Sequence, residues 1–435
     1  MLYLRAPRRN AEGVTPCAFN HCNRTGVREW RPLLHGEIAR RALDIANAII
    51  EEIVARSTDD ATLADGAAGH ALVHAYSASV SPGHRTDDTA SRELDRAIDA
   101  VASTEMTPSL YAGFLGVAWT AQLLSGAGMD SAADANEDID AALLELVAVS
   151  PWSGEYDLIS GLVGFGVYAL ERLPRPAASS MLEAIVDRLD ELGERRNDGI
   201  TWHTPVRFLP PPARESHPDG WYNLGLAHGV PGVIAFLAGV CAARVAAPKA
   251  RPLLDGAVSW LLARGGPQSD EGAFGYCVDR SNGPEPSRHA WCYGDPGVAT
   301  AVLLAARAIS QGAWRDVALS VARRAALRPR PHTGVVDASL CHGAAGLAHL
   351  YNRLFQATGE RDFAVEARYW IERTLEYRGV GGIAGYRRAE FDGTQIDDTG
   401  LLNGAAGIAL ALLAAASNVE PGWDRAFLLS LRPLT

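Results

Sequence analysis

Near its C-terminal end the sequence reads GAAGIALALLAAA, from Gly404 to Ala416. A Gly-x-x-Gly pair opens this stretch, and an apolar run rich in small residues follows it. Six further segments share the pattern: GAAGHALVHAY from Gly66, GFLGVAWTAQLL from Gly113, GLVGFGVYAL from Gly161, GVPGVIAFLAGV from Gly229, GDPGVATAVLLAA from Gly294 and GAAGLAHLYNRLF from Gly343. Recurrence of one pattern along a chain indicates a repeat architecture, in which every repeat contributes one supersecondary unit.

Each repeat is expected to hold two helices. The Gly-x-x-Gly opens a helix that is apolar on nearly all sides, as a buried helix must be. Amphipathic helices are predicted between these motifs, as in RELDRAIDAVAS from Arg92, SMLEAIVDRLDEL from Ser180 and RDFAVEARYWIERTLEY from Arg361. Strand signals are sparse and confined to long connections such as GITWHTPVRFLPPP from Gly199. The sequence therefore predicts an all-α protein of seven helical hairpins, which could form an open solenoid or a closed toroid.

Composition excludes several classes of function. The 435 residues carry a formal net charge of −11, whereas nucleic acids and anionic membranes reward a basic face. No run of eighteen or more apolar residues occurs, so no membrane span is expected. Residues 1–30 lack the apolar core of a signal peptide and are expected to form a disordered extension. Six cysteines without a dense framework indicate a reducing cytoplasm.

The repeat also predicts where polar side chains meet. If every Gly-x-x-Gly helix starts at the same end of the fold, the residues just before the glycines should cluster there. These residues include His228 in LAHG, Cys292 and Tyr293 in WCYG, and Cys341 and His342 in CHG. Asp65 and Asn403 occupy the same offset, and we interpret them as helix caps.

Cys292, Cys341 and His342 together offer two thiolates and one imidazole. Such a set makes a three-ligand zinc site whose fourth position is open, as in catalytic zinc sites. Helix N-termini would favour the thiolate form of each cysteine. The alternative for each cysteine alone is a small buried side chain, which is how we interpret Cys241 and Cys277 because they lack the offset.

Three further residues are candidates for acid–base work or charge stabilisation. His228 could exchange a proton near neutral pH, or it could be a helix-start histidine bonded to backbone. Asp157, in EYDLISG, could orient His228 or itself transfer a proton. Arg288, four residues before Cys292, could hold a carboxylate or stabilise an oxyanion, or it could be a surface residue.

The motifs LAHGVPG, RHAWCYGDPG and SLCHGAAG, with YDLISG upstream and LLNGAAGIALAL downstream, resemble the lanthionine synthetase C family from about Gly66 onward. The resemblance implies one α/α toroid domain over residues 31–435, with an inner and an outer ring of seven helices. It implies that Cys292, Cys341 and His342 bind Zn²⁺. It further implies that His228 and Asp157 are catalytic, and that Arg288 and Tyr293 are the active-site arginine and tyrosine.

The implied activity is that of a stand-alone lanthipeptide cyclase. Cysteine thiolates of a precursor peptide add to dehydroalanine or dehydrobutyrine and form lanthionine or methyllanthionine thioether rings. The expected partners are a dehydrated precursor peptide (leader plus core), a separate dehydratase and a transporter. Two alternatives stay open: a LanC-like zinc protein that binds thiols or peptides without forming rings, and an α/α prenyltransferase or terpene-cyclase relative.

Overall fold

The computed structural model describes residues 30–56, 58–81, 86–126, 134–266, 272–279, 285–390 and 392–430. The expected N-terminal extension therefore lies outside the described residues, apart from Trp30. This tryptophan is buried, and its Nε1–H donates to the carbonyl oxygen of Ala414 at 2.9 Å.

Every Gly-x-x-Gly segment begins a helix, and the first glycine of each is the N-cap residue. The seven helices are α2 (Ala67–Val80), α4 (Phe114–Ser125), α6 (Leu162–Glu171), α9 (Val230–Ala243), α11 (Asp295–Ala308), α13 (Ala344–Thr358) and α15 (Ala405–Ala416). They are buried on nearly all sides, as their composition predicts; in α15 every residue up to Ala415 is buried.

Amphipathic helices alternate with them, and the three that the sequence identifies lie within α3, α7 and α14. The set comprises α1 (Gly36–Ala55), α3 (Thr86–Ser103), α5 (Glu137–Val147), α7 (Pro176–Leu192), α10 (Ala247–Leu262), α12 (Gly312–Ala326) and α14 (Arg361–Glu376). The remaining elements are α8 (Pro211–Ser216), the 3-10 turns η1 (Val206–Phe208), η2 (Arg330–His332) and η3 (Gly422–Phe427), and six strands of two or three residues. The all-α class is confirmed.

Close backbone packing explains why the motif needs glycine at both positions. The segment before each buried helix folds back over the helix start, so that its carbonyls accept the first helical N–H groups; Leu162 N–H, for example, donates to Glu155 O at 3.2 Å. A Cβ on the first glycine, as at Gly113, would collide with the carbonyl oxygen six residues earlier. A Cβ on the second glycine, as at Gly346 or Gly407, meets the same obstacle. Only glycine lets the two backbones approach this closely.

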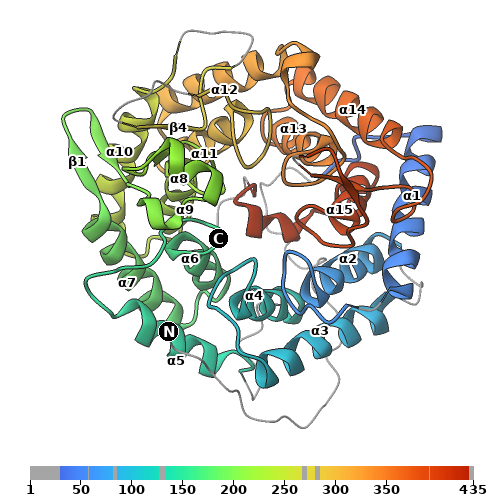
Figure 1. Cartoon of the computed structure of the whole chain (residues 1–435), viewed down its shortest axis with the longest axis horizontal. Helices are drawn as coiled ribbons and strands as arrows, with labels where there is room; N and C mark the ends of the chain where they lie inside the picture. Colours follow the sequence, from blue (N-terminus) through green and yellow to red (C-terminus); the bar gives the residue numbers. More distant parts are fainter. Residues whose placement is uncertain are drawn as a thin grey trace. The chain divides into compact units, whose positions relative to one another are not determined.

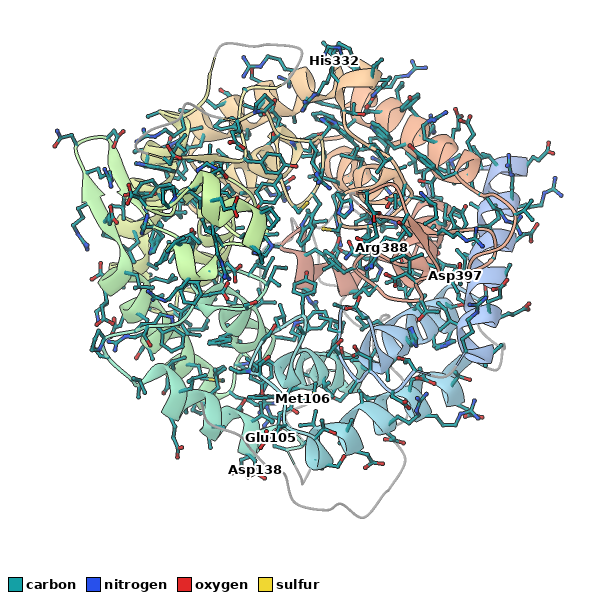
Figure 2. The ribbon with its side chains drawn as sticks, in the orientation of Figure 1. Glu105, Met106, Asp138, His332, Arg388 and Asp397 are labelled. Atoms are coloured by element: carbon teal, nitrogen blue, oxygen red, sulfur yellow. The ribbon has the colours of Figure 1, made fainter. Side chains whose placement is uncertain are left out.

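The described chain divides into two compact units. One comprises the residues up to Ile139 together with Val335–Ser430, and the other comprises Asp140–Gly334. In the first unit α13, α15, α2 and α4 pack in succession, and α14, α1 and α3 cover them (Figure 1). Small side chains such as Ala67, Ala68 and Ala97 keep α2, α3 and α4 close together. A short antiparallel pair, β5 (Arg388–Ala389) with β6 (Gln395–Ile396), carries Arg388 and is followed by Asp397, both labelled in Figure 2.

In the second unit α6, α9 and α11 pack in succession and are covered by α7, α10 and α12 (Figure 1). Two antiparallel pairs are added to the helices: β1 (Glu194–Arg196) with β2 (Gly199–Thr201), and β3 (Tyr222–Asn223) with β4 (Cys277–Val278). The second pair joins the segment before α9 to the segment before α11, and both segments lead into helix starts that carry candidate site residues.

No helix among the described residues is long and apolar enough to cross a membrane. The paired arrangement of buried and covering helices follows the sequence-based expectation. Closure of the pairs into a toroid, and a single domain over residues 31–435, stay predictions.

Candidate active site

Backbone hydrogen bonds tie together the turns that precede the buried helices. In the first unit the N–H of Cys341 donates to Leu402 O at 2.9 Å, and the N–H of Leu402 donates to Ala64 O at 3.1 Å. In the second unit the N–H of Ala227 donates to Cys292 O at 3.3 Å, and the N–H of Leu158 donates to Ala227 O at 3.2 Å. Within each unit, the residues just before the glycines therefore gather at one end of the helix layer, as the repeat predicts.

Cys292, Cys341 and His342 are the residues whose donor atoms could bind a metal. Cys292 precedes α11 in the second unit, whereas Cys341 and His342 precede α13 in the first. Cys292 is buried, with 6% of its surface exposed, while Cys341 and His342 are half-buried. Cysteine thiolates and histidine nitrogens are the usual protein ligands of zinc. The chemistry of the donor set thus fits zinc.

His228 and Asp157 form a close ion pair. The imidazole Nδ1 lies 2.5 Å from Asp157 Oδ2, and the other carboxylate oxygen accepts the N–H of Ser160 at 2.8 Å. The Asp157 side chain is 6% exposed, whereas the His228 side chain is 43% exposed. A buried carboxylate fixed from two sides therefore holds one nitrogen of the ring, while the ring itself reaches solvent.

Electrostatics at this pair favour a protonated histidine. Burial opposes the imidazolium, but the hydrogen bond and the negative charge of Asp157 outweigh it, so the pKa of His228 is raised. Cys292 and Glu155 add to the upward shift. Burial and the neighbouring Asp157 raise the pKa of Glu155 to about 7. Asp157 therefore influences two titratable neighbours, and the pKa of each is raised above its ordinary value.

Tyr293 packs beside His228, with ring centroids 6.3 Å apart and ring planes 27° from parallel. Gly225 makes room for it, because a Cβ there would collide with both the Tyr293 ring and the Cys292 carbonyl. The phenol oxygen of Tyr293 accepts a hydrogen bond from Asn223 Nδ2 at 3.0 Å. Burial raises the pKa of the phenol, so that it stays protonated and able to donate.

Arg288 is half-buried, and Tyr276 holds its guanidinium. The Arg288 Nε–H donates to the Tyr276 hydroxyl at 2.8 Å. The Tyr276 ring contacts Tyr293, with centroids 4.6 Å apart. Tyr276, in the segment before β4, therefore contacts both Arg288 and Tyr293.

Two sequence-based interpretations need correction. Asp65 and Asn403 do not cap helices, because the N-cap residue is the following glycine and no side-chain cap bond forms. The amides at these helix starts donate instead to backbone carbonyls of the folded-back segment, as Ala405 does to Asp398. Cys277 is buried and Cys241 half-buried, in keeping with a packing role.

Sequence reasoning missed Asn223, Tyr276 and Glu155. For Asn223 and Glu155 a signal existed, because both stand six residues before the first glycine of a motif. Asp60, Asp337 and Asp398 occupy that position in three other repeats. The replacement of aspartate at this position could have identified Asn223 and Glu155 as candidate site residues. Tyr276 lies outside the repeat offset and carried no such signal.

Comparison with known proteins identifies the fold. A family model described as lanthionine synthetase C-like protein matches residues 57–428. Among solved structures, nisin cyclase matches with a TM-score of 0.67 and 20% sequence identity, over 90% of this chain and 97% of that chain. At this level of identity the likeness shows a shared fold. None of the curated proteins matches the sequence.

Proposed function

Because the chain belongs to the lanthionine synthetase C-like family, we propose that it is a zinc-dependent lanthipeptide cyclase. Its substrate would be a precursor peptide that contains cysteine together with dehydroalanine or dehydrobutyrine. Its product would be a lanthionine or methyllanthionine thioether ring. The observation that carries the proposal is the donor set of Cys292, Cys341 and His342, since a Cys₂His set leaves a fourth position for a substrate thiol.

The reaction adds a thiol across a carbon–carbon double bond. The C–S bond forms at the β-carbon, the π bond breaks, and the electron pair passes to the α-carbon and its carbonyl as an enolate. The thiol loses one proton and the α-carbon gains one, so no oxidant or co-reactant is needed. A zinc ion held by Cys292, Cys341 and His342 would supply the Lewis acidity that lowers the pKa of the substrate thiol.

His228 is the residue we assign to deliver the proton. Its raised pKa favours the protonated ring, and 43% of its side chain is exposed and so open to a substrate. Asp157 binds Nδ1, so we assign Nε2 as the ring nitrogen that delivers the proton. The imidazole regains a proton from solvent after each addition, which completes the cycle.

We assign Arg288 and Tyr293 to stabilisation of the enolate oxygen. A guanidinium and a phenol held in place by protein contacts stabilise an oxyanion without reorganisation in the transition state. Tyr276 and Asn223 supply those contacts. A dehydratase would have to provide the dehydrated residues, and we propose such an enzyme, together with a transporter for the product, as partners.

Incubation with a dehydrated precursor tests the proposal. Ring formation leaves the peptide mass unchanged but removes one free thiol per ring, so thiol alkylation followed by mass spectrometry counts the rings. We expect zinc-loaded protein to remove thiols and His228→Ala protein to remove them at least about 100-fold more slowly. Peptide binding with all thiols intact would instead indicate the zinc protein that binds without cyclising.

A further inference from the structure

One position of the repeat forms the same turn in four places. Six residues before the first glycine, an aspartate or asparagine Oδ1 accepts the N–H of the residue two places further on. The distances are 2.6 Å for Asp60, 2.8 Å for Asn223, 2.9 Å for Asp337 and 2.7 Å for Asp398. The turn therefore accepts either side chain, because it uses only the oxygen that both possess.

Asn223 makes a second bond that an aspartate could not make. Gly225 N–H occupies its Oδ1, which fixes the orientation of the amide and points Nδ2 at the Tyr293 hydroxyl, 3.0 Å away. Asn223 is 3% exposed, so water does not compete for these contacts. The amide donates, and the phenol oxygen of Tyr293 accepts.

This direction leaves the phenol proton available for another acceptor. A carboxylate in the same place would accept a hydrogen bond from the Tyr293 O–H, which could then no longer donate to the substrate. We propose that Asn223 is a positioning residue, which keeps the Tyr293 hydroxyl as a hydrogen-bond donor to the substrate. The substrate group that accepts this hydrogen bond is an oxyanion. Its identification as the enolate oxygen rests on the proposed function.

The strand pair β3–β4 holds the donor in place. Asn223 pairs with Cys277, and Leu224 N–H donates to Tyr276 O at 2.9 Å. Tyr276, the residue just before β4, contacts the Tyr293 ring, with ring centroids 4.6 Å apart. The Asn223 amide and the Tyr276 ring therefore fix Tyr293 together, the amide at its hydroxyl and the tyrosine at its ring.

Asn223→Asp tests the inference, with Asp60→Asn as the matched control at the equivalent position of another repeat. Both substitutions keep the turn. We expect Asn223→Asp to lower kcat for ring formation about 100-fold with little change in KM, because the substrate loses one preorganised donor. Asp60→Asn should keep the wild-type rate. Equal rates for wild type and Asn223→Asp would overturn the inference.

Asn223→Ala separates positioning from folding. It removes both the turn bond and the donor but leaves the phenol proton free, so it should lower Tm more than Asn223→Asp and lower kcat less. If Asn223 had a purely structural role, the variant with the lower Tm would also have the lower kcat. That result would also overturn the inference. In a Tyr293→Phe background, Asn223→Asp should have no further effect on kcat.

A spectroscopic measurement keeps this inference distinct from the proposed function. With ¹³C-labelled tyrosine, the Tyr293 Cζ resonance, assigned by its loss in Tyr293→Phe, should move in Asn223→Asp and stay in Asp60→Asn. An unmoved resonance in Asn223→Asp would contradict the inference. Absence of rings with wild-type protein would contradict the proposed function alone.

Discussion

His228 Nδ1 and Asp157 Oδ2 lie 2.5 Å apart, although 71 residues separate them in the sequence. The N–H of Leu158 and the carbonyl of Ala227 bring their two turns together, so backbone hydrogen bonding places the pair. The ion pair is thus a product of the repeat, which brings equivalent turns side by side and lets each contribute a different side chain.

Asp157→Asn should move the pH dependence of ring formation. Removing the negative charge lowers the pKa of His228, so the protonated ring is lost at lower pH and the alkaline limb of kcat/KM shifts toward acid. We expect a larger loss of activity at pH 8 than at pH 6, and kcat/KM profiles of the two proteins check it. The amide oxygen of the substituted side chain would still accept the Ser160 N–H, so an unchanged alkaline limb would show that Asp157 does not set the titration.

The same pair links stability to pH. The pKa of His228 is higher in the folded chain than the unfolded value of about 6.5, so folding binds a proton more tightly. The stabilisation is fully present below the unfolded pKa and is lost as pH rises through the folded value. Urea unfolding across this range should show wild type losing stability relative to Asp157→Asn.

Gly346→Ala should destabilise the fold, because its new Cβ would collide with the Leu340 carbonyl oxygen. We expect a loss of more than about 2 kcal/mol, as for other overpacked sites. Gly312→Ala is the matched control: it lies at the start of α12 with open space around it and should stabilise by about 0.4 to 1 kcal/mol. Equal unfolding midpoints for the two variants would refute this account of the motif.

His74→Leu should make the protein less sensitive to acid. Among the described residues neither ring nitrogen of His74 has a hydrogen-bond partner, and burial lowers its pKa to about 4. Between these pH values His74 is protonated in the unfolded chain but not in the folded chain. The free energy of unfolding of the wild type therefore falls as pH drops from about 6.5 toward 4.

His70→Leu serves as the comparison. Burial also lowers the pKa of His70, but its ring contacts the Thr399 carbonyl oxygen at 3.1 Å, so this substitution loses a hydrogen bond and should lower stability at pH 7. Thermal unfolding at pH 7 and pH 5 checks both variants. A His74→Leu protein that is less stable than wild type at pH 5 would mean that the ring has a partner in solution.

The sequence could predict the repeats and the residues that precede them. A helix that is buried on nearly all sides needs an apolar sequence, and this signal can be recognised without knowing what the helix packs against. It could therefore place Cys292 and Cys341 at the same position, two residues before the first glycine, and His228 one residue before it. The capping interpretation of Asp65 and Asn403 failed because a folded-back backbone, invisible to propensity rules, already satisfies the helix amides. Tyr276 could not be found, since its role depends on the β3–β4 pairing of two segments more than 50 residues apart.

Zinc content tests the central claim, which is that Cys292, Cys341 and His342 hold one ion. Protein dialysed against metal-free buffer would be measured by plasma mass spectrometry beside Cys292→Ala, Cys341→Ala and the control Cys241→Ala, which alters a half-buried cysteine outside the group. We predict one zinc ion per chain in wild type and in Cys241→Ala, and loss of zinc from the other two. Stoichiometric zinc in Cys292→Ala would contradict the ligand set.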